Sequence, residues 1–103
     1  MSQTRRIQKV SSLLKKELSL ILNHDLDEPI ISDNFISISK IEISPDLYYC
    51  KIYITSAVED EKKEKMVDSL NNLKSVIRHK LTQRVEMRRI PELTFKIDRA
   101  LEK

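Results

Sequence analysis

The chain has 103 residues, 40% of them hydrophobic and 34% charged, with a formal net charge of +3 at pH 7. That size suits one domain with one modest core. The absence of glycine, the single cysteine and the lack of an apolar run of roughly 18 residues exclude glycine-rich phosphate loops, an internal disulfide and a membrane span. We therefore expect one cytoplasmic domain over residues 1–103, because the N-terminal region also lacks the apolar core of a signal peptide.

The first predicted element is an amphipathic helix over residues 4–23. An apolar stripe about 120° wide runs along it at helical spacing. The stripe contains Ile7, Val10, Leu14, Leu18, Ile21 and Leu22. Arg5, Lys9 and Lys16 project from the opposite face, and we predict that they contact phosphates because one sign of charge occupies the whole face. The alternative is a solvated face that keeps a small protein soluble.

An acidic stretch and Pro29 end this helix, since the residue before a proline is pushed out of helical conformation. The acidic residues are Asp25, Asp27, Glu28 and Asp33, and no base compensates them locally. We predict a solvated loop here.

Two strands follow over residues 35–44 and 47–57, joined by a tight turn. Pro45 fits the first central position of a type I turn and Asp46 the second. The first strand changes phase between Ile38 and Ile41, which predicts a β-bulge near residues 39–40.

Alternation places the residues of the second strand on two faces. Tyr48, Cys50, Ile52 and Ile54 share one face, and Leu47, Tyr49, Lys51 and Tyr53 share the other. Cys50 is predicted to be a small buried hydrophobe rather than a nucleophile. Tyr49 and Tyr53 either cover a sheet face or stack on bases.

The next element is an amphipathic helix over residues 59–73 with an acidic first turn, as the helix dipole prefers. Ile77, Leu81 and Val85 continue its apolar stripe, and periodicity leaves open whether there are one or two helices. Ser75 would suit the N-cap of a separate third helix. Leu93, Phe95 and Ile97 then alternate with polar residues and predict a third strand.

Positive charge is concentrated in the last third of the chain. Lys80, Arg84, Arg88 and Arg89 cluster where a helix meets a strand, with only Glu86 to compensate them locally. This is the charge distribution of a small nucleic-acid-binding domain. The full set of predicted RNA-binding residues is Arg5, Lys9, Lys16, Lys74, Arg78, Lys80, Arg84, Arg88 and Arg89.

For Arg78, pairing with a carboxylate inside the fold explains the residue nearly as well as RNA contact does. His24 and His79 lack any ligand set, so we expect no metal and no cofactor. No nucleophile, base or carboxylate pair predicts catalysis, and we expect neither an enzyme nor a small-molecule substrate.

Several strings give the chain a family resemblance over nearly its whole length. They are Asp27-Glu-Pro29, Ile43-Ser-Pro-Asp-Leu47, Lys51-Ile-Tyr-Ile-Thr55 and, most specifically, Ile90-Pro-Glu-Leu-Thr-Phe95 after the double arginine. On these residues the chain resembles the ribosome-binding factor A family. The resemblance implies a type II KH-like fold, which is a two-layer α+β domain ordered helix-strand-strand-helix-helix-strand, with a three-stranded sheet and helices on one face.

The resemblance also implies a function. The family binds the 30S small ribosomal subunit or its precursor and assists late maturation and processing of 16S rRNA, and we expect a monomer when the protein is free. Relatives kink two helices at an Ala-x-Gly pattern, where this chain has Leu73-Lys74-Ser75. The C-terminal segment of many relatives is expected to be short or absent. Two alternatives stay open: a KH-like domain for generic single-stranded RNA, and a module that docks an acidic protein.

Overall fold

The computed structural model describes residues 2–99, with side chains from residue 5 onward, and it begins with the predicted amphipathic helix. This helix, α1 (Ser2–His24), buries its apolar stripe, including Leu14, Leu18 and Ile21. The observed helix thus confirms the one predicted over residues 4–23 from the spacing of its apolar residues.

α1 ends at His24, before the acidic stretch, so Pro29 does not itself terminate this helix as the sequence predicted. Pro29 starts a short helix, α2 (Pro29–Ser32), that the sequence analysis did not predict. Proline is favoured at the first helical position because its missing N–H would have no partner there. Buried Ile31 then fixes this single turn against the core.

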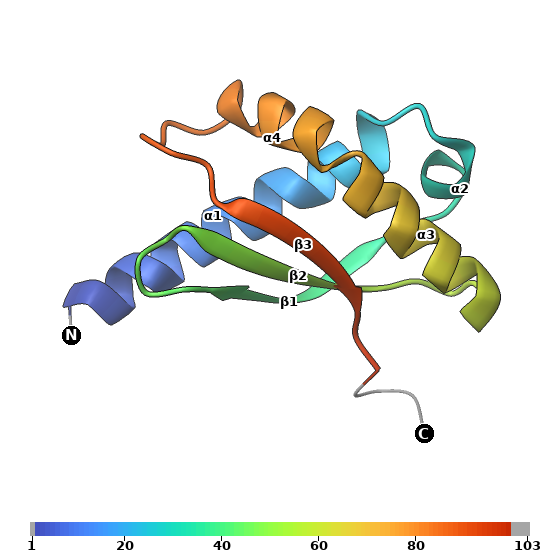
Figure 1. Ribbon diagram of the computed structural model, residues 1–103, viewed down its shortest axis with the longest axis horizontal. Coiled ribbons are helices and arrows are strands. Elements are labelled where there is room, and N and C mark those ends of the chain that lie inside the picture. Colours follow the sequence, from blue (N-terminus) through green and yellow to red (C-terminus); the bar gives the residue numbers. More distant parts are fainter. Residues whose placement is uncertain (1, 100–103) are drawn as a thin grey trace.

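The sheet has the strand order β1-β2-β3, with β1 (Ser37–Ile43), β2 (Tyr49–Thr55) and β3 (Glu92–Ile97). β1 and β2 pair antiparallel, whereas β3 pairs parallel to β2. A parallel pair needs a long crossover, and the helical segment between β2 and β3 supplies it (Figure 1).

The predicted bulge and turn are both confirmed. The β1–β2 register shifts between Ile38 and Lys40, so the apolar residues on both sides of the shift face the core. The Leu47 N–H donates to the Ser44 carbonyl over 2.9 Å, which closes the turn. Leu47 then adopts a left-handed φ of 64°, and the second strand starts only at Tyr49. Tyr48, expected to share a face with Cys50, therefore lies outside the strand and is exposed.

The helical pattern after β2 forms two helices, α3 (Asp60–Asn72) and α4 (Lys74–Thr82). Leu73 separates them with φ −97° and ψ 8°. The expected N-cap at Ser75 is wrong, because Ser75 lies inside α4. The helix also stops before the basic segment, so Arg84, Arg88 and Arg89 belong to a loop.

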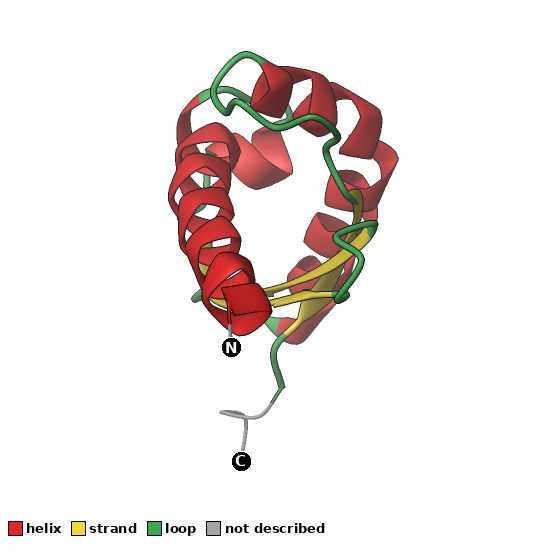
Figure 2. Ribbon diagram, turned by 90° about the vertical axis from the view of Figure 1, so that its left-hand side faces the viewer, coloured by secondary structure: helices red, strands yellow, loops and turns green. Residues whose placement is uncertain are grey.

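Within residues 2–99 the helices cover one face of the sheet and leave the other open, which confirms the two-layer α+β class. Figure 2 shows α1 across the core from α3 and α4, with the sheet closing the core from below. The inward residues of β2 and β3, among them Cys50, Ile52 and Phe95, are almost fully buried. No described helix packs on the outward residues of the sheet.

Two asparagines tie helices to the two edge strands. Asn71 of α3 donates to the Phe95 carbonyl over 3.1 Å and accepts from the Phe95 N–H over 2.9 Å. Asn23 of α1 makes the same pair of bonds with Ile36, just before β1, at 2.8 and 2.9 Å. Each side-chain amide thus satisfies one backbone N–H and one backbone carbonyl on the open side of an edge strand, where no further strand pairs.

Cys50 is expected to resist chemical labelling until the protein unfolds. Burial raises the pKa of its thiol to about 12, and only the thiolate is reactive. A bulky maleimide should therefore label the native protein slowly and the urea-unfolded protein at once. Cys50→Ala should lower the free energy of unfolding by about 1 kcal/mol. Rapid stoichiometric labelling of native protein would contradict the burial of this face.

Candidate RNA interface

Three segments that are distant in sequence meet at one end of the molecule. They are the N-terminal half of α1, the β1–β2 turn and the loop between α4 and β3, all at the left of Figure 1. A groove of about 390 Å³ lies between them. It is lined by Arg6, Val10, Asp46, Leu47, Tyr48, Glu86, Met87, Arg88 and Arg89.

The turn on one side of the groove is held by Asp46. Its Oδ1 accepts from the Ser44 hydroxyl over 2.6 Å and from the Tyr48 N–H over 3.0 Å. These hydrogen bonds, and to a smaller extent the charge of Arg89, lower the pKa of Asp46. Leu47, on the same rim, holds a left-handed conformation that costs a non-glycine residue about 1–2 kcal/mol. Strained residues of this kind cluster at functional sites.

Arg89 is positioned by an aromatic ring. Its guanidinium carbon lies 4.3 Å from the centroid of the exposed Tyr48 ring. A contact of this kind stabilises an exposed cation by roughly 0.5–1 kcal/mol. Because the ring covers one face of the guanidinium, its N–H edge remains available for the bidentate contact that arginine makes with phosphate.

The other cations at this end are free of internal partners. Within residues 5–99, neither Arg6 nor Arg88 forms an ion pair, and the same holds for Arg5 and Lys9 on the exposed face of α1. We call these residues the basic end, which consists of Arg5, Arg6, Lys9, Arg88 and Arg89. Among the described residues that line the groove, two are acidic, Asp46 and Glu86, against three arginines.

Arg6 was missing from the sequence-based set of contacts. It lies four residues before Val10, on the flank of the apolar stripe that turns toward the groove. Because residues four apart lie on the same side of a helix, the sequence could have placed Arg6 next to the structure that packs against Val10. The loop of Arg88 and Arg89 could not have been predicted as its neighbour from one sequence.

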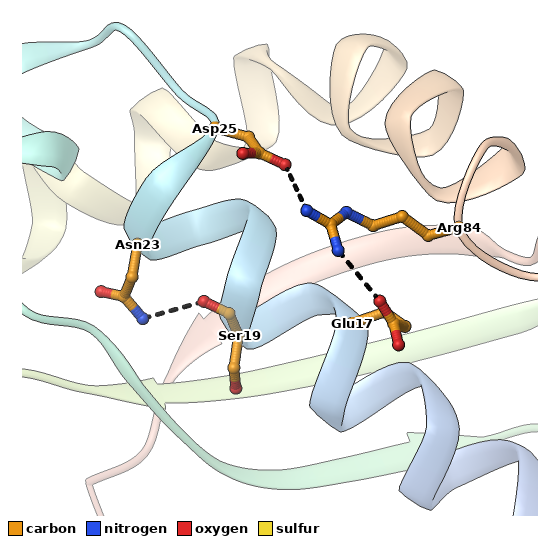
Figure 3. A network of polar contacts seen from close by, with 5 residues as sticks. All are labelled: Glu17, Ser19, Asn23, Asp25 and Arg84. Atoms are coloured by element: carbon orange, nitrogen blue, oxygen red, sulfur yellow. Dashed lines mark hydrogen bonds and ion pairs between the residues drawn. The ribbon is translucent and has the colours of Figure 1, made fainter.

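Arg84 departs from the sequence analysis. Its guanidinium donates to Glu17 over 3.1 Å and to Asp25 over 2.9 Å (Figure 3). Glu86 is the only acidic residue near this cluster in sequence, but the fold supplies Arg84 with two carboxylates that are distant in sequence. The bonds to Asp25 and Glu17 raise the pKa of Arg84, and they fasten the end of α4 to α1. These two internal partners favour a structural role for Arg84 over the predicted RNA contact, and a substitution proposed below distinguishes the two.

The remaining predicted contacts lie away from the groove. Arg78 donates to the Ile90 carbonyl over 2.7 Å and pairs with Glu92 at 3.4 Å, so its side chain has partners within the fold. Lys74 and Lys80 are half-buried on α4. Lys80 lines a second groove of about 360 Å³ with the acidic stretch of residues 25–28. Lys16 is exposed on α1, two turns beyond Lys9.

No group of three or more His, Cys, Asp or Glu side chains within residues 5–99 is arranged to hold a metal ion. No helix within residues 2–99 is both long enough and apolar enough to cross a membrane.

Sequence comparison relates the chain to one family. The family model described as Ribosome-binding factor A matches residues 6–103. A protein of that name from Prochlorococcus marinus strain MED4 is 56% identical over 103 residues, which are 100% of this chain and 78% of the relative. The protein of that name from Synechococcus sp. strain CC9311 is 35% identical over 103 residues and is covered to 77%.

Structure comparison finds the same fold. The crystal structure of ribosome-binding factor A from Thermus thermophilus superposes with a TM-score of 0.77 at 24% identity, covering 90% of this chain and 96% of that one. The solution structure of a Thermotoga maritima protein, described as a putative ribosome binding factor A, gives 0.62 at 23% identity and covers 93% and 86%. A Thermus thermophilus homology model of ribosome binding factor A, fitted into a cryo-electron microscopy map of its 30S complex, gives 0.72 at 24%, with coverages of 89% and 94%.

Proposed function

Because this chain belongs to the ribosome-binding factor A family, we propose that it is a non-catalytic assembly factor that binds the 30S small ribosomal subunit or its precursor. There it assists the late maturation and processing of 16S rRNA. A cytoplasmic location and a monomeric free state belong to the same proposal. The Thermus thermophilus relative that was fitted into a map of a 30S complex supports this choice of partner.

The observation that carries the proposal is the basic end. Arg6, Arg88 and Arg89 come from segments more than 80 residues apart in the chain, yet they line one groove. Phosphate contacts by such residues would supply affinity, and the shape of the folded rRNA would supply specificity.

The charge of the molecule is also polarised along its length. Acidic residues gather at the end opposite the basic end, around α2 and the start of α3 (Figure 1). They are Asp27, Glu28, Asp33 and Glu61, together with Glu59 and Asp60, which pair with Lys62 and Lys63. The negatively charged rRNA attracts the basic end and repels the acidic end. The protein would therefore approach rRNA in one orientation.

The proposed mechanism is selection of one rRNA conformation. A protein that binds one state of a folding equilibrium more tightly shifts the population toward it. Processing nucleases could then act on rRNA ends that this conformation presents. The factor would lose affinity once the mature conformation formed.

Co-sedimentation with purified subunits tests this function directly. The protein should pellet with small subunits and not with large ones, and it should bind small subunits more tightly than free single-stranded RNA. Equal affinity for short oligonucleotides would favour the generic RNA-binding alternative. A partner that survives nuclease treatment of an extract, with no subunit binding, would favour the protein-docking alternative.

Arg84→Gln should affect stability rather than RNA affinity, because its guanidinium bridges Glu17 and Asp25. We expect the free energy of unfolding to fall only slightly, because solvent screens an ion pair at this exposed position. Urea denaturation measures this change. The log–log salt slope of subunit binding should stay unchanged, and a fall of about 0.7 or more would show that Arg84 contacts a phosphate after all.

A further inference from the structure

The outer face of the sheet is a second exposed surface that the basic end does not include. Alternation along the central strand β2 directs Tyr49, Lys51 and Tyr53 away from the core. The register places Lys51 between Glu42 of β1 and Thr94 of β3, and Tyr53 between Lys40 and Lys96. Side chains that bear charges and aromatic rings therefore meet on one open face.

Tyr49 is the available ring on this face. Its side chain is 61% exposed, and its hydroxyl makes no hydrogen bond with a described residue. Tyr53 differs, because its hydroxyl donates to Glu42 over 3.1 Å and the Lys40 ammonium lies 5.3 Å from its ring centroid. Tyr53 is thus held in place and partly covered, whereas the ring of Tyr49 can accept a partner.

The charges on this face favour an anion. Lys40 neutralises Glu42 at 3.0 Å, and Arg78 neutralises Glu92 at 3.4 Å. Lys51 and Lys96, in contrast, form no ion pair within the described part of the chain. They are diagonal neighbours on adjacent strands, and ideal sheet geometry places their Cα atoms about 8 Å apart. The unpaired positive charge next to the free ring is therefore that of Lys51. Lys96 lies further along the face, opposite Tyr53, and shares the face with Asp98, which accepts from the Ser39 hydroxyl over 2.6 Å.

A shallow groove adjoins that ring. It has a volume of about 230 Å³ and is lined by Glu42, Ile43, Ser44, Tyr49 and Lys51. Sites for whole small ligands measure about 300–1,000 Å³, so this groove suits one planar ring rather than a complete ligand. Tyr49 also follows Tyr48 directly, and Tyr48 lines the groove of the basic end. A single-stranded RNA bound at the basic end could thus continue onto the outer face of the sheet.

We propose that the outer face of the sheet binds unpaired RNA nucleotides, with a base stacked on Tyr49 and the phosphates contacted by Lys51 and Lys96. Stacking on an aromatic side chain tolerates any base, whereas a duplex hides its base faces. The proposal rests on the proposed function only in taking RNA as the partner. It adds the recognition of single-stranded rRNA to the phosphate contacts of the basic end.

The test uses the full chain and a fluorescent, non-self-complementary RNA oligonucleotide of mixed sequence, followed by anisotropy over a salt series. Tyr49→Ala should weaken binding roughly tenfold at every salt concentration, since one stacked base is lost. Its log–log slope should not change. Tyr49→Phe keeps the ring and should bind like the parent. Lys51→Gln or Lys96→Gln should instead reduce the slope by roughly 0.7.

A second readout does not depend on removing the ring. The chain has no tryptophan, so Tyr49→Trp introduces a single reporter whose fluorescence a stacked base should quench. A hairpin duplex of the same composition should compete poorly. Absence of quenching, or equal binding by Tyr49→Ala and Tyr49→Phe, overturns the proposal. If either of these results is found and the protein still pellets with small subunits, the sheet-face proposal fails while the proposed function stands.

Discussion

Replacing Arg88 and Arg89 together by glutamate is expected to weaken binding to small ribosomal subunits about a hundredfold or more. Each charge-assisted hydrogen bond contributes about 1.5–3 kcal/mol, and each 1.4 kcal/mol is about tenfold in affinity. Neither guanidinium forms an ion pair within residues 5–99, so the fold should survive the change. The log–log salt slope should fall by roughly 0.7 for each lost single-strand contact and 0.9 for each duplex contact.

The matched control reverses two charges elsewhere. Lys62 and Lys65 are exposed on α3, away from the basic end, and their double change to glutamate alters the net charge equally. Co-sedimentation at several salt concentrations compares the two variants. Equal losses would mean that only net charge matters. Unchanged binding by the Arg88/Arg89 variant, with a native circular dichroism spectrum, would remove the basic end from the interface.

Asn71→Ala is expected to cause the largest loss of stability of the substitutions considered. It would strip the Phe95 N–H and carbonyl of their partners at the edge of the sheet. Each buried backbone group left unsatisfied costs about 1–3 kcal/mol, so we expect a loss of about 3 kcal/mol. For a domain of about 100 residues, each kcal/mol corresponds to a fall of roughly 4–8 °C in Tm.

The neighbouring residue provides the control for this substitution. Asn72 is exposed at the end of the same helix, and Asn72→Ala should change stability by less than about 0.5 kcal/mol. Thermal unfolding of both variants, followed by circular dichroism, measures the difference. Similar Tm values for the two would show that the Asn71 amide does not fasten α3 to β3.

The local elements could be predicted because each reflects a local pattern. The stripe of α1, the alternation of β3 and the phase change at the bulge follow from spacing alone. The missed elements depend on backbone geometry that composition does not reveal. α2 starts at a proline that equally well ends a helix, and left-handed Leu47 delays the second strand and exposes Tyr48.

The site was harder to predict because its parts are distant in sequence. Arg84 lies 67 residues from Glu17 and 59 from Asp25, so the local charge count could not identify its partners. Arg6 is even further along the chain from its groove neighbours, 82 residues from Arg88 and 83 from Arg89. Charge clustering correctly drew attention to the last third of the chain, but tertiary structure decides which of its cations are already paired.

One measurement tests the central claim most directly. An extract is resolved on a density gradient and probed for this protein, and the ends of 16S rRNA are mapped in a strain that lacks it. We expect the protein in the small-subunit fractions, not with translating ribosomes, and unprocessed small-subunit rRNA in the deletion strain. If the protein stays at the top of the gradient and the rRNA ends are normal without it, it is not an assembly factor for this subunit.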